Sequence, residues 1–352
     1  RLGGDEFVIL LESYSSNSQL GRIAQKIIQV VGEPIELSGH LISVGASIGI
    51  ALYPDDAASS DELLKNADVA MYHAKQIGRN TFQFFTPRMN VEASQRLFAE
   101  SQLKQAYEQG NFINHYQPIV DSLSGKAKGV ELLLRWQRDD TLVMPGEFIC
   151  IAEEMALIIP MTEQALHRGL TDLKLWRKYR PDLFLSVNLS AIHFSQDSLI
   201  PMLKEKLKQF DLPANSLKLE VTESTLIKDP EKVIQKMRSL AKLGVTLALD
   251  DFGTGYSSLQ YLKQLPLDIL KIDRSFISGI GIDSADEAIV EATLVLANKL
   301  CMNCIAEGVE TKEQLDYLSA RECYVIQGYL YSKPVCAEII TQFIIDDKME
   351  LP

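Results

Sequence analysis

The chain has 352 residues, of which 46% are hydrophobic, and a formal net charge of −12. This length accommodates one small and one large domain, each with its own core. Such an acidic chain lacks the basic surface needed to bind a nucleic-acid polymer, so that class of partner is excluded. The sequence has no apolar stretch long enough for a membrane span and no secretory signal pattern, so we expect a cytoplasmic protein, or the cytoplasmic part of a membrane-anchored or sensor-linked one.

Residues 1–88 are predicted to form the small domain. It opens with a Gly-Gly-Asp-Glu-Phe motif made of Gly3, Gly4, Asp5, Glu6 and Phe7. The two glycines predict a tight hairpin turn that lets a phosphate or a guanine approach the backbone. The carboxylates that follow can bind Mg²⁺ or assist deprotonation of a hydroxyl group. Taken alone, the motif is more often an ordinary turn.

A linker is expected between the two domains. The strand-like residues 82–85 end before Pro87, because proline cannot continue a strand ladder. Residues 89–110 then show the pattern of a helix with charged faces, and we expect this helix to connect the small domain to residues 111–352.

Eight short apolar runs, each a candidate strand, occupy the larger domain. They cover residues 115–120, 128–135, 184–188, 217–221, 246–250, 269–272, 304–306 and 324–327. All but the first pair are separated by stretches of helical periodicity, which predicts an α/β fold closed as a (β/α)8 TIM-like barrel. Residues 121–126, between the first two runs, are too few for a crossover helix, so we expect a hairpin and one antiparallel strand in the barrel.

Polar residues sit at or near the ends of these runs. In such barrels the catalytic groups come from the C-terminal ends of different strands. Any one acidic residue there could be a helix cap, but independent capping accounts poorly for the whole set. The residues are Glu131, Asn188, Glu220, Asp250, Asp251, Asp273 and Glu307.

Adjacent carboxylates at the end of a buried strand, Asp250 and Asp251, would repel each other unless a cation lay between them. Oxygen ligands without His or Cys favour Mg²⁺ or Mn²⁺ over zinc. Two such ions could share Asp250 and clamp the attacking and leaving oxygens of a phosphoryl displacement.

The larger domain resembles the EAL domain of cyclic di-GMP phosphodiesterases, from about residue 95 to the C-terminus and in the family's order. The segments that carry the resemblance are Tyr116-Gln117-Pro118-Ile119, Glu131-Leu132-Leu133-Leu134-Arg135-Trp136, Asn188-Leu189-Ser190, Glu220-Val221-Thr222-Glu223-Ser224, the Asp250-Asp251-Phe252-Gly253-Thr254-Gly255-Tyr256-Ser257-Ser258-Leu259 run, Lys271-Ile272-Asp273, Ala306-Glu307-Gly308-Val309-Glu310 and Gln327-Gly328-Tyr329.

This resemblance implies metal-dependent hydrolysis of cyclic di-GMP to linear pGpG, a reaction of second-messenger signalling that controls biofilm formation and motility. It implies two sets of metal ligands that share Asp250. The first ion would be held by Glu131, Asn188, Glu220 and Asp250, and the second by Asp250, Asp251 and Glu307.

Catalytic roles are implied for Glu131, Lys271, Glu307 and Glu223. Lys271 would hold the nucleophilic water or offset phosphate charge, and Glu223 would stabilise the loop 251–258. The group that activates the water stays open among Lys271, Glu307 and a metal-bound hydroxide. Substrate contacts are implied for Gln117, Arg135, Asp273, Glu310 and Gln327.

One departure from the family motif is Leu132, where alanine is usual. Neighbouring side chains on a strand point to opposite faces, so Leu132 should face the packed helices and affect packing more than chemistry.

Two other functions remain open. One is a catalytically silent receptor for cyclic di-GMP. The other is an Mg²⁺-dependent barrel enzyme that acts on a carboxylate or enolate substrate, with Lys271 as base.

The small domain resembles the second half of a GGDEF diguanylate cyclase domain, through the opening motif together with residues 47–51, 67–75 and 78–80. The family's metal-binding Asp and Arg-x-x-Asp site lie upstream of this motif, and we expect the strand partners of residues 7–11 and 44–51 to be absent as well. The half-domain by itself is therefore not expected to cyclise GTP, whereas a complete domain in a longer parent protein could bind GTP. A homodimer is also expected, because members of the EAL family often dimerise through the barrel.

Overall fold

A computed structural model describes residues 1–14, 16–37, 39–226, 230–253 and 262–346 of the chain. Its contacts divide the chain into two compact units, Arg1–Ser101 and Gln102–Pro352. The division falls within helix α3 (Pro87–Glu108), which includes all but the last two residues of the predicted linker 89–110. None of the described helices is both long and apolar enough to cross a membrane.

Before α3, the described residues of the first unit form two helices and two small sheets. They are α1 (Asn17–Val31), β1 (Ile35–Leu37), β2 (His40–Ile42), β3 (Ile48–Ile50), α2 (Ser60–Gln76) and β4 (Phe82–Phe84). Strands β1 and β2 form an antiparallel hairpin, and β3 pairs with β4 in parallel. A Cβ on Gly49 would lie 1.9 Å from the carbonyl oxygen of Ala67, so only glycine lets α2 lie this close to β3.

Two expectations for this unit have different outcomes. The expectation that residues 44–51 lack a strand partner is wrong, because Ile48–Ile50 pair with Phe82–Phe84, which lie far along the chain. The predicted Gly-Gly turn is present: the backbone N–H of Glu6 donates to the carbonyl oxygen of Gly3 at 2.8 Å, and Gly4 has φ of +52°. Residues 7–11, after the turn, form no strand and are exposed.

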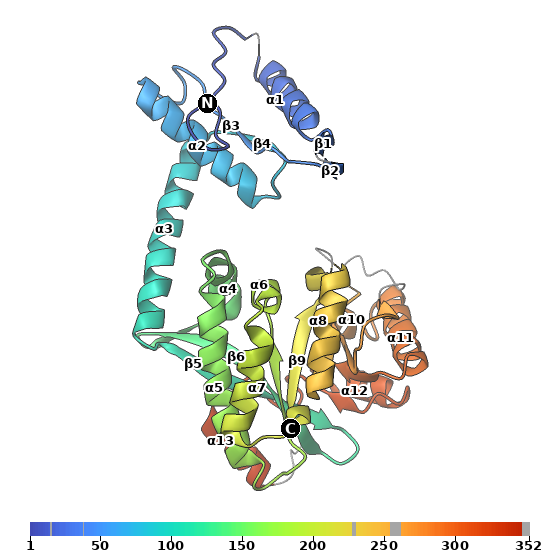
Figure 1. Ribbon diagram of the computed structural model, residues 1–352. Helices are drawn as coiled ribbons and strands as arrows, with labels where there is room; N and C mark the ends of the chain where they lie inside the picture. The colour runs from blue at the N-terminus through green and yellow to red at the C-terminus, as the bar shows by residue number, and fades with distance from the viewer. Residues whose placement is uncertain (15, 38, 227–229, 254–261, 347–352) are drawn as a thin grey trace. The chain divides into compact units, whose positions relative to one another are not determined.

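The second unit is the predicted closed barrel of eight strands (Figure 1). Its strands are β5 (Phe112–Asp121), β6 (Lys126–Arg138), β8 (Phe184–Asn188), β9 (Leu217–Thr222), β10 (Thr246–Phe252), β11 (Ile269–Ile272), β12 (Asn303–Ala306) and β13 (Val325–Ile326). They follow the order β5-β13-β12-β11-β10-β9-β8-β6, and pairing of β5 with β6 closes the circle. The predicted antiparallel strand is β5, which runs against both neighbours, β6 and β13. An additional strand, β7 (Thr141–Val143), extends β6 as a hairpin.

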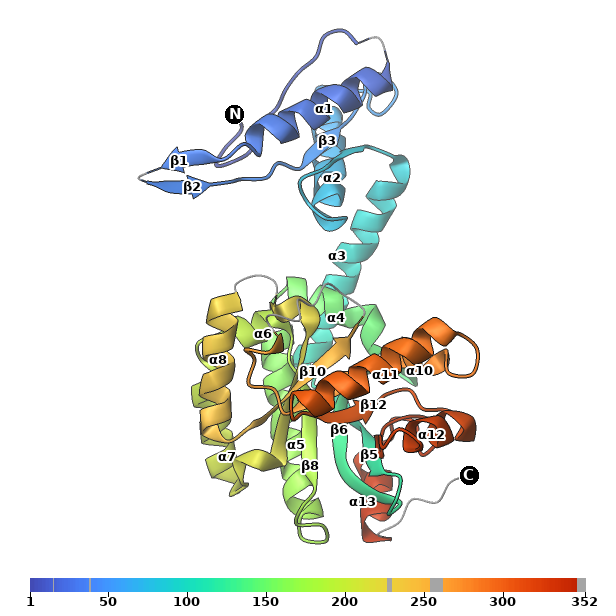
Figure 2. The same cartoon turned by 90° about the vertical axis from the view of Figure 1, so that its right-hand side faces the viewer.

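Helices surround these strands; in Figure 2, α7 and α8 lie on one side of them and α11 and α12 on the other. The helices are α4 (Pro145–Glu154), α5 (Ile158–Trp176), α6 (Ala191–Ser195), α7 (Leu199–Phe210), α8 (Pro230–Leu243), α10 (Arg274–Ser278), α11 (Ser284–Lys299), α12 (Lys312–Ser319) and α13 (Ala337–Ile345), with short 3-10 turns at Ala214–Ser216 and Glu223–Leu226. Local signals set several helix starts. For example, the Asp283 side chain accepts from the backbone of Ala285 at the start of α11, and Thr311 and Gln314 form a capping box on α12.

Alternating side chains divide the barrel into an outer and an inner core. Outward residues such as Leu132, Leu185, Leu219 and Leu249 pack against the helices. A separate apolar cluster consists of one residue from each of five strands, namely Ile119, Phe184, Ala248, Ile269 and Ile305. Three of these, Phe184, Ala248 and Ile269, precede a polar inward position by two or four residues on the same strand, and Ile305 precedes Glu307, directly after β12. The apolar cluster therefore fills the interior of the barrel directly below the polar residues at its mouth.

Leu132 faces the helices, as expected from strand alternation. It is 5% exposed and belongs to the outer core. Its neighbour on α5 is Gly169, where an added Cβ would lie 2.7 Å from Leu132 Cδ1 and 2.9 Å from Leu185 Cδ2. The glycine thus makes room for the leucine.

We predict that Leu132→Ala lowers the free energy of unfolding by about 2 to 5 kcal/mol, the usual cost of truncating a buried leucine. Gly169→Ala should also destabilise the protein, because crowding outweighs the gain in helix propensity of about 1 kcal/mol. The double variant should be more stable than the sum of the two single effects, as urea unfolding in a double-mutant cycle can measure. Additive effects within about 0.5 kcal/mol would contradict this packing relation.

Helix α6 contains a fully buried histidine, His193. Burial lowers the pKa of His193 to about 4, and the nearby ammonium of Lys236 acts in the same direction. The carboxylate of Glu163 lies 3.9 Å from Nε2. In the unfolded chain a histidine pKa is about 6.5, so the unfolded state binds more protons between these two values.

We therefore predict that the stabilising effect of keeping His193 neutral is complete above about pH 6.5 and is lost as the pH falls toward 4, by up to about 3 kcal/mol. His193→Leu should flatten this acid-side slope. Urea unfolding of both proteins at pH 5 and 7.5 measures the difference. Equal slopes in the two proteins would show that His193 does not cause the loss.

Candidate active site

Polar side chains from all eight barrel strands or the residues directly after them meet at the mouth of the barrel. The strands supply Gln117 on β5, Glu131 on β6, Asn188 on β8, Glu220 on β9, Asp250 on β10 and Lys271 on β11, while Glu307 follows β12 and Gln327 follows β13. Parallel strands end at the same edge of a barrel, which is why residues so distant in the sequence converge here.

Lys271 is the centre of this group. Its side chain is fully buried, and its Nζ lies 2.7 Å from Glu220 Oε2, 3.4 Å from Asp250 Oδ1 and 3.8 Å from Glu131 Oε2. The ammonium also forms an ion pair with Glu307. One ammonium therefore faces four carboxylates, which leaves an excess of negative charge if all four are ionised.

Amide and hydroxyl groups orient two of these carboxylates. Asn188 Nδ2 donates to Glu131 Oε1 at 2.5 Å, and Gln327 Nε2 donates to the other oxygen of Glu131. The same Gln327 nitrogen contacts Gln117 Oε1 at 3.0 Å. Ser186 Oγ donates to Glu220 Oε1 at 2.5 Å. Both carboxylates are thus held in fixed positions before any ligand arrives.

Burial controls the protonation of the cluster. It raises the pKa of Glu220, Asp250 and Glu307, because it disfavours their charged forms, while the Lys271 ammonium partly opposes the increase. For Lys271 itself, burial acts to lower the pKa, but the surrounding carboxylates outweigh it and raise the pKa well above its usual value. Lys271 consequently stays protonated.

The oxygen donors match a hard divalent cation in chemistry but are not prearranged around one. In the part of the chain that the structure describes, no three His, Cys, Asp or Glu side chains form a group that could hold a metal ion. The carboxylates converge on Lys271 instead. Burial first, and neighbouring carboxylates second, raise the pKa of Glu220 and Glu307, and a cation would favour their charged forms. Carboxylate and amide oxygens are the ligands that Mg²⁺ and Mn²⁺ prefer.

Five predicted site residues of the barrel lie outside the central cluster, namely Asp251, Asp273, Glu310, Arg135 and Glu223. Asp251 has φ of +55° and is half-buried; burial, together with Asp250 and Asp273, raises its pKa. Asp273 caps α10, because its carboxylate accepts from the backbone N–H of Ser275 at 2.9 Å. Glu310 is exposed and forms an ion pair of 2.8 Å with Arg274. Asp251, Asp273 and Glu310 form a rim around the cluster.

Arg135 lies on β6, four residues after Glu131. It is 4% exposed, and its Nη1 donates to the carbonyl oxygen of Leu134 at 2.9 Å. Burial lowers its pKa, while Tyr329 and Glu131 both act to raise it, so its guanidinium is within electrostatic reach of both. The remaining donors of the fork are suited to a bidentate anion.

Glu223 is buried, and neither carboxylate oxygen has a hydrogen-bond partner among the described residues. Its predicted partner is the loop 251–258, of which residues 254–258 lie outside the described residues. The role of Glu223 in stabilising that loop stays a prediction.

Sequence reasoning missed three residues. Ser186 shares the inward face of β8 with Asn188, and its position two residues earlier could have identified it. Arg274 directly follows the predicted residue Asp273, but no periodic pattern marks residues in loops. Tyr329 belongs to the segment Gln327-Gly328-Tyr329 that carries the resemblance, but it was given no role.

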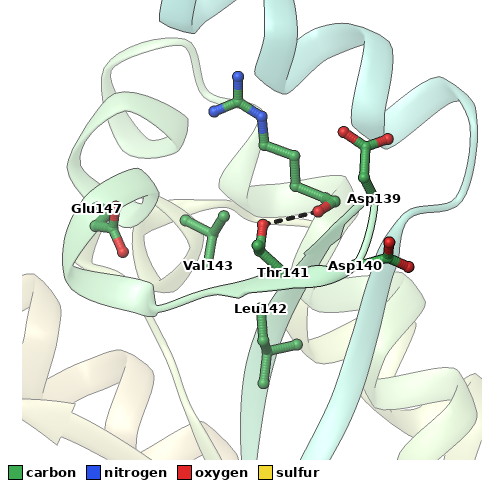
Figure 3. Close-up of a pocket in the computed structure, with 7 residues that line it drawn as sticks. Asp139, Asp140, Thr141, Leu142, Val143 and Glu147 are labelled. Atoms are coloured by element: carbon green, nitrogen blue, oxygen red, sulfur yellow. Dashed lines mark hydrogen bonds between the residues drawn. The ribbon is translucent and has the colours of Figure 1, made fainter.

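A surface hollow of about 560 Å³ lies elsewhere, at the β6–β7 hairpin (Figure 3). Its polar groups serve local structure: Thr141 Oγ1 donates to the carbonyl oxygen of Arg138 at 2.8 Å, and the carboxylate of Glu147 accepts from the backbone of Met144. It contains none of the predicted site residues, so we assign it no chemistry.

Residues 100–334 match the family model of the EAL domain, and residues 1–81 match that of the diguanylate cyclase GGDEF domain. The chain belongs to the EAL domain family. Known phosphodiesterases of this family depend on a divalent metal ion.

Among curated proteins, the chain is similar to the bifunctional diguanylate cyclase/cyclic di-GMP phosphodiesterase MucR of Pseudomonas aeruginosa, with 42% identity over 340 residues, 96% of this chain and 50% of MucR. It is 39% identical to the cyclic di-GMP phosphodiesterase NbdA of the same organism, over 98% of this chain and 44% of NbdA. A solved structure of the PaMucR phosphodiesterase with c-di-GMP superposes with a TM-score of 0.67 at 40% identity, over 69% of this chain and 99% of that one. The chain spans about half the length of the curated relatives it matches.

We predict that Lys271→Met lowers the free energy of unfolding by about 3 to 5 kcal/mol at neutral pH, because it leaves buried carboxylates without a partner. Carboxylates with a raised pKa bind more protons in the folded state, so their destabilising effect grows as the pH rises through that pKa. The variant should therefore lose more stability at pH 8 than at pH 5.

Urea unfolding in chelator at both pH values measures this effect. Lys204→Met, which removes an exposed lysine from α7, is the matched control and should leave stability unchanged. A loss for Lys271→Met that is the same at both pH values would contradict the electrostatic explanation.

Proposed function

We propose that the barrel hydrolyses one phosphodiester bond of cyclic di-GMP to give linear pGpG, with Mg²⁺ or Mn²⁺ as cofactor. The observation that carries the proposal is the buried cluster of Glu131, Glu220, Asp250 and Glu307 around Lys271 at the mouth of the barrel. Membership in the EAL family and the named activities of MucR and NbdA support this choice of substrate.

The residues that would hold the cofactor are those whose oxygens face the mouth. Glu131, Asn188, Glu220 and Asp250 would supply the first site, and Asp250, Asp251 and Glu307 the second. When bound, the cation supplies Lewis-acid polarisation of the phosphoryl group and a lower pKa for coordinated water.

In the proposed reaction the oxygen of water forms a bond to phosphorus, and the bond from phosphorus to the ribose O3′ breaks. Arg135 binds the non-bridging oxygens of the scissile phosphate through its fork of donors, while Gln117 and Gln327 orient Glu131 and the substrate. Asp273 and Glu310 contact substrate from the rim. Hydrogen is conserved because the proton taken from water is finally delivered to O3′.

The protonation of Lys271 assigns its role. An ammonium with a raised pKa cannot accept the proton of water, so Lys271 offsets the charge that develops on the phosphoryl group. Burial raises the pKa of Glu307 well above its usual value, and Glu307 and a metal-bound hydroxide stay the two candidates for the base. The same argument weighs against a barrel enzyme that uses Lys271 as base toward an enolate.

A catalytically silent receptor for cyclic di-GMP is the second candidate. It is favoured by one observation, namely that the described carboxylates contact Lys271 and are not prearranged around a metal ion.

For the first unit we propose a regulatory role toward the barrel, based on the match of residues 1–81 to the GGDEF domain. In a longer parent protein a complete domain would bind GTP. Assembly as a homodimer is part of the same proposal.

To test the function, the 352-residue chain is incubated with cyclic di-GMP in Mg²⁺, Mn²⁺, Ca²⁺ or chelator, and pGpG is followed by chromatography. We expect product in Mg²⁺ or Mn²⁺ and none in chelator. Glu131→Gln, which keeps the shape but removes the charge of a ligand, should reduce turnover by at least about 100-fold. Glu205→Gln on the exposed face of α7 is the matched control.

Each result decides between the candidates. Tight binding without product would move the protein to the receptor class. Full turnover by Glu131→Gln would show that the ligand assignment is wrong, and turnover that persists in chelator would exclude the metal requirement.

A further inference from the structure

A cavity of about 310 Å³ lies on the outside of the barrel, where β5, α5 and α13 meet. Helix α13 packs against both β5 and α5, as Figure 1 shows for the two helices. Its volume is at the lower end of the range of about 300 to 1,000 Å³ that ligand sites have, which suits a small molecule. The residues that matter for its chemistry are Ile113, Asn114, Tyr116, Arg168, Asp172 and Ala337.

Two opposite charges face this cavity without pairing. Arg168 and Asp172 lie one turn apart on α5, a spacing at which an Arg and an Asp can form an ion pair. Instead, Arg168 Nη1 donates to the carbonyl oxygen of Phe112, and Asp172 Oδ2 accepts from the Tyr116 hydroxyl. Neither charge has an ion-pair partner among the described residues. The remaining donors of the guanidinium and the second carboxylate oxygen are therefore available to a ligand.

Buried polar groups beneath these two side chains hold them in place. Tyr116 is fully buried, and its hydroxyl accepts from Asn114 Nδ2 at 3.0 Å. The same nitrogen donates to the carbonyl oxygen of Ala165 at 2.9 Å, whereas Asn114 Oδ1 is buried and has no hydrogen-bond partner among the described residues. A buried acceptor without a partner is unfavourable, and an N–H group of a ligand would satisfy it.

The distribution of charge indicates the class of ligand. Burial raises the pKa of Asp172, the hydrogen bond from Tyr116 opposes this, and the carboxylate of Glu338 on α13 adds to it. A cationic group is therefore favoured at Asp172, and an anionic group at the fork of Arg168. Residues one turn apart on a helix have Cβ atoms about 5 to 6 Å apart, so the two groups of the ligand must be close together.

An α-amino acid meets these conditions, because its ammonium and its carboxylate are attached to the same carbon. Ile113 and Ala337 offer apolar surface for its side chain. A simple anion would leave Asp172 without a partner, and a simple amine would leave Arg168 without one.

This cavity shares strand β5 with the mouth of the barrel. Tyr116 and Gln117 are neighbours on β5, so their side chains point to opposite faces of the sheet. On the inner face, Gln327 Nε2 contacts Gln117 Oε1 at 3.0 Å and also donates to Glu131. A ligand that fixes Tyr116 from outside would therefore restrict the movement of Glu131 inside.

We propose that the outer cavity binds an α-amino acid with a small apolar side chain, with its carboxylate on Arg168 and its ammonium on Asp172, and that this strengthens cation binding at the mouth. The first half goes beyond the proposed function, and the second half rests on it. A ligand that orders β5 lowers the entropic cost of a second ligand that needs the same order, which gives positive cooperativity.

The test begins with calorimetry of the 352-residue chain with L-valine and L-leucine in chelator. Arg168→Gln and Asp172→Asn should each weaken binding by about 10- to 150-fold, the usual effect of losing a hydrogen bond to a charged group. Both variants keep the inner contact, because glutamine can still donate to the backbone carbonyl and asparagine can still accept from Tyr116. Arg177→Gln, which alters another α5 guanidinium that donates to a carbonyl, is the matched control and should bind like the parent chain.

Two analogues of leucine separate the contributions of its charges. Isopentylamine lacks the carboxylate and isocaproate lacks the ammonium, and each should bind at least about 10-fold more weakly than leucine. These analogues need no variant, so the assignment is tested even if a variant fails to fold. Absence of binding by both amino acids at millimolar concentrations would overturn the inference. Isocaproate or inorganic phosphate binding as tightly as leucine would show an anion site and would also overturn it.

A third measurement tests the link to the mouth. Saturation with leucine should lower the Kd for Mn²⁺, followed by calorimetry, by about 5-fold or more, as coupled sites usually do. Asp172→Asn should abolish this effect. An unchanged Kd for Mn²⁺ in a chain that binds leucine would overturn the coupling. A chain that binds leucine but neither Mn²⁺ nor cyclic di-GMP would overturn the proposed function and the coupling, while the amino-acid site would stand.

Discussion

A single buried ammonium, that of Lys271, holds the mouth of the barrel together. Burying it without partners would be unfavourable by several kcal/mol, and the same is true of the carboxylates that surround it. Each group is tolerated only because the others are present. Since Glu131, Glu220, Asp250 and Glu307 come from four different segments, the ion cluster joins β6, β9, β10 and the end of β12 to β11. The same ion pairs therefore hold the barrel strands together and fix the geometry of the site.

The apolar cluster inside the barrel also helps to fix the positions of the charged side chains at the mouth. Ile119, Phe184, Ala248, Ile269 and Ile305 fill the interior beneath the charged residues. Phe184 fits there because its strand neighbour is Gly129, where a Cβ would lie 2.3 Å from the ring. Because apolar side chains lie below them, the charges at the mouth interact in surroundings of low polarity, which makes their orientation by Asn188, Ser186 and Gln327 effective.

Centre and rim of the mouth have different physical characters. The centre is buried and acidic, with oxygens suited to a cation and to phosphoryl chemistry. At the rim, Tyr329, Arg274 and Lys333 offer an exposed ring and positive charge. Arg135 interacts electrostatically with both parts, because Tyr329 and Glu131 both act to raise its pKa. In the proposed function, such a division would allow an acidic protein to attract an anionic substrate at one place while keeping its carboxylates for the cofactor.

The sequence by itself determined the closed barrel, the reversed first strand and the polar residues that converge at strand ends, because alternation, helical periodicity and loop length are local properties. It did not determine which side chains meet. Only the tertiary structure placed Lys271 among four carboxylates, turned Asp273 into the cap of α10, paired Glu310 with Arg274, and joined residues 48–50 to residues 82–84. Those outcomes depend on contacts between distant segments and on the balance of burial and charge among them, and neither is encoded in any short stretch of the chain.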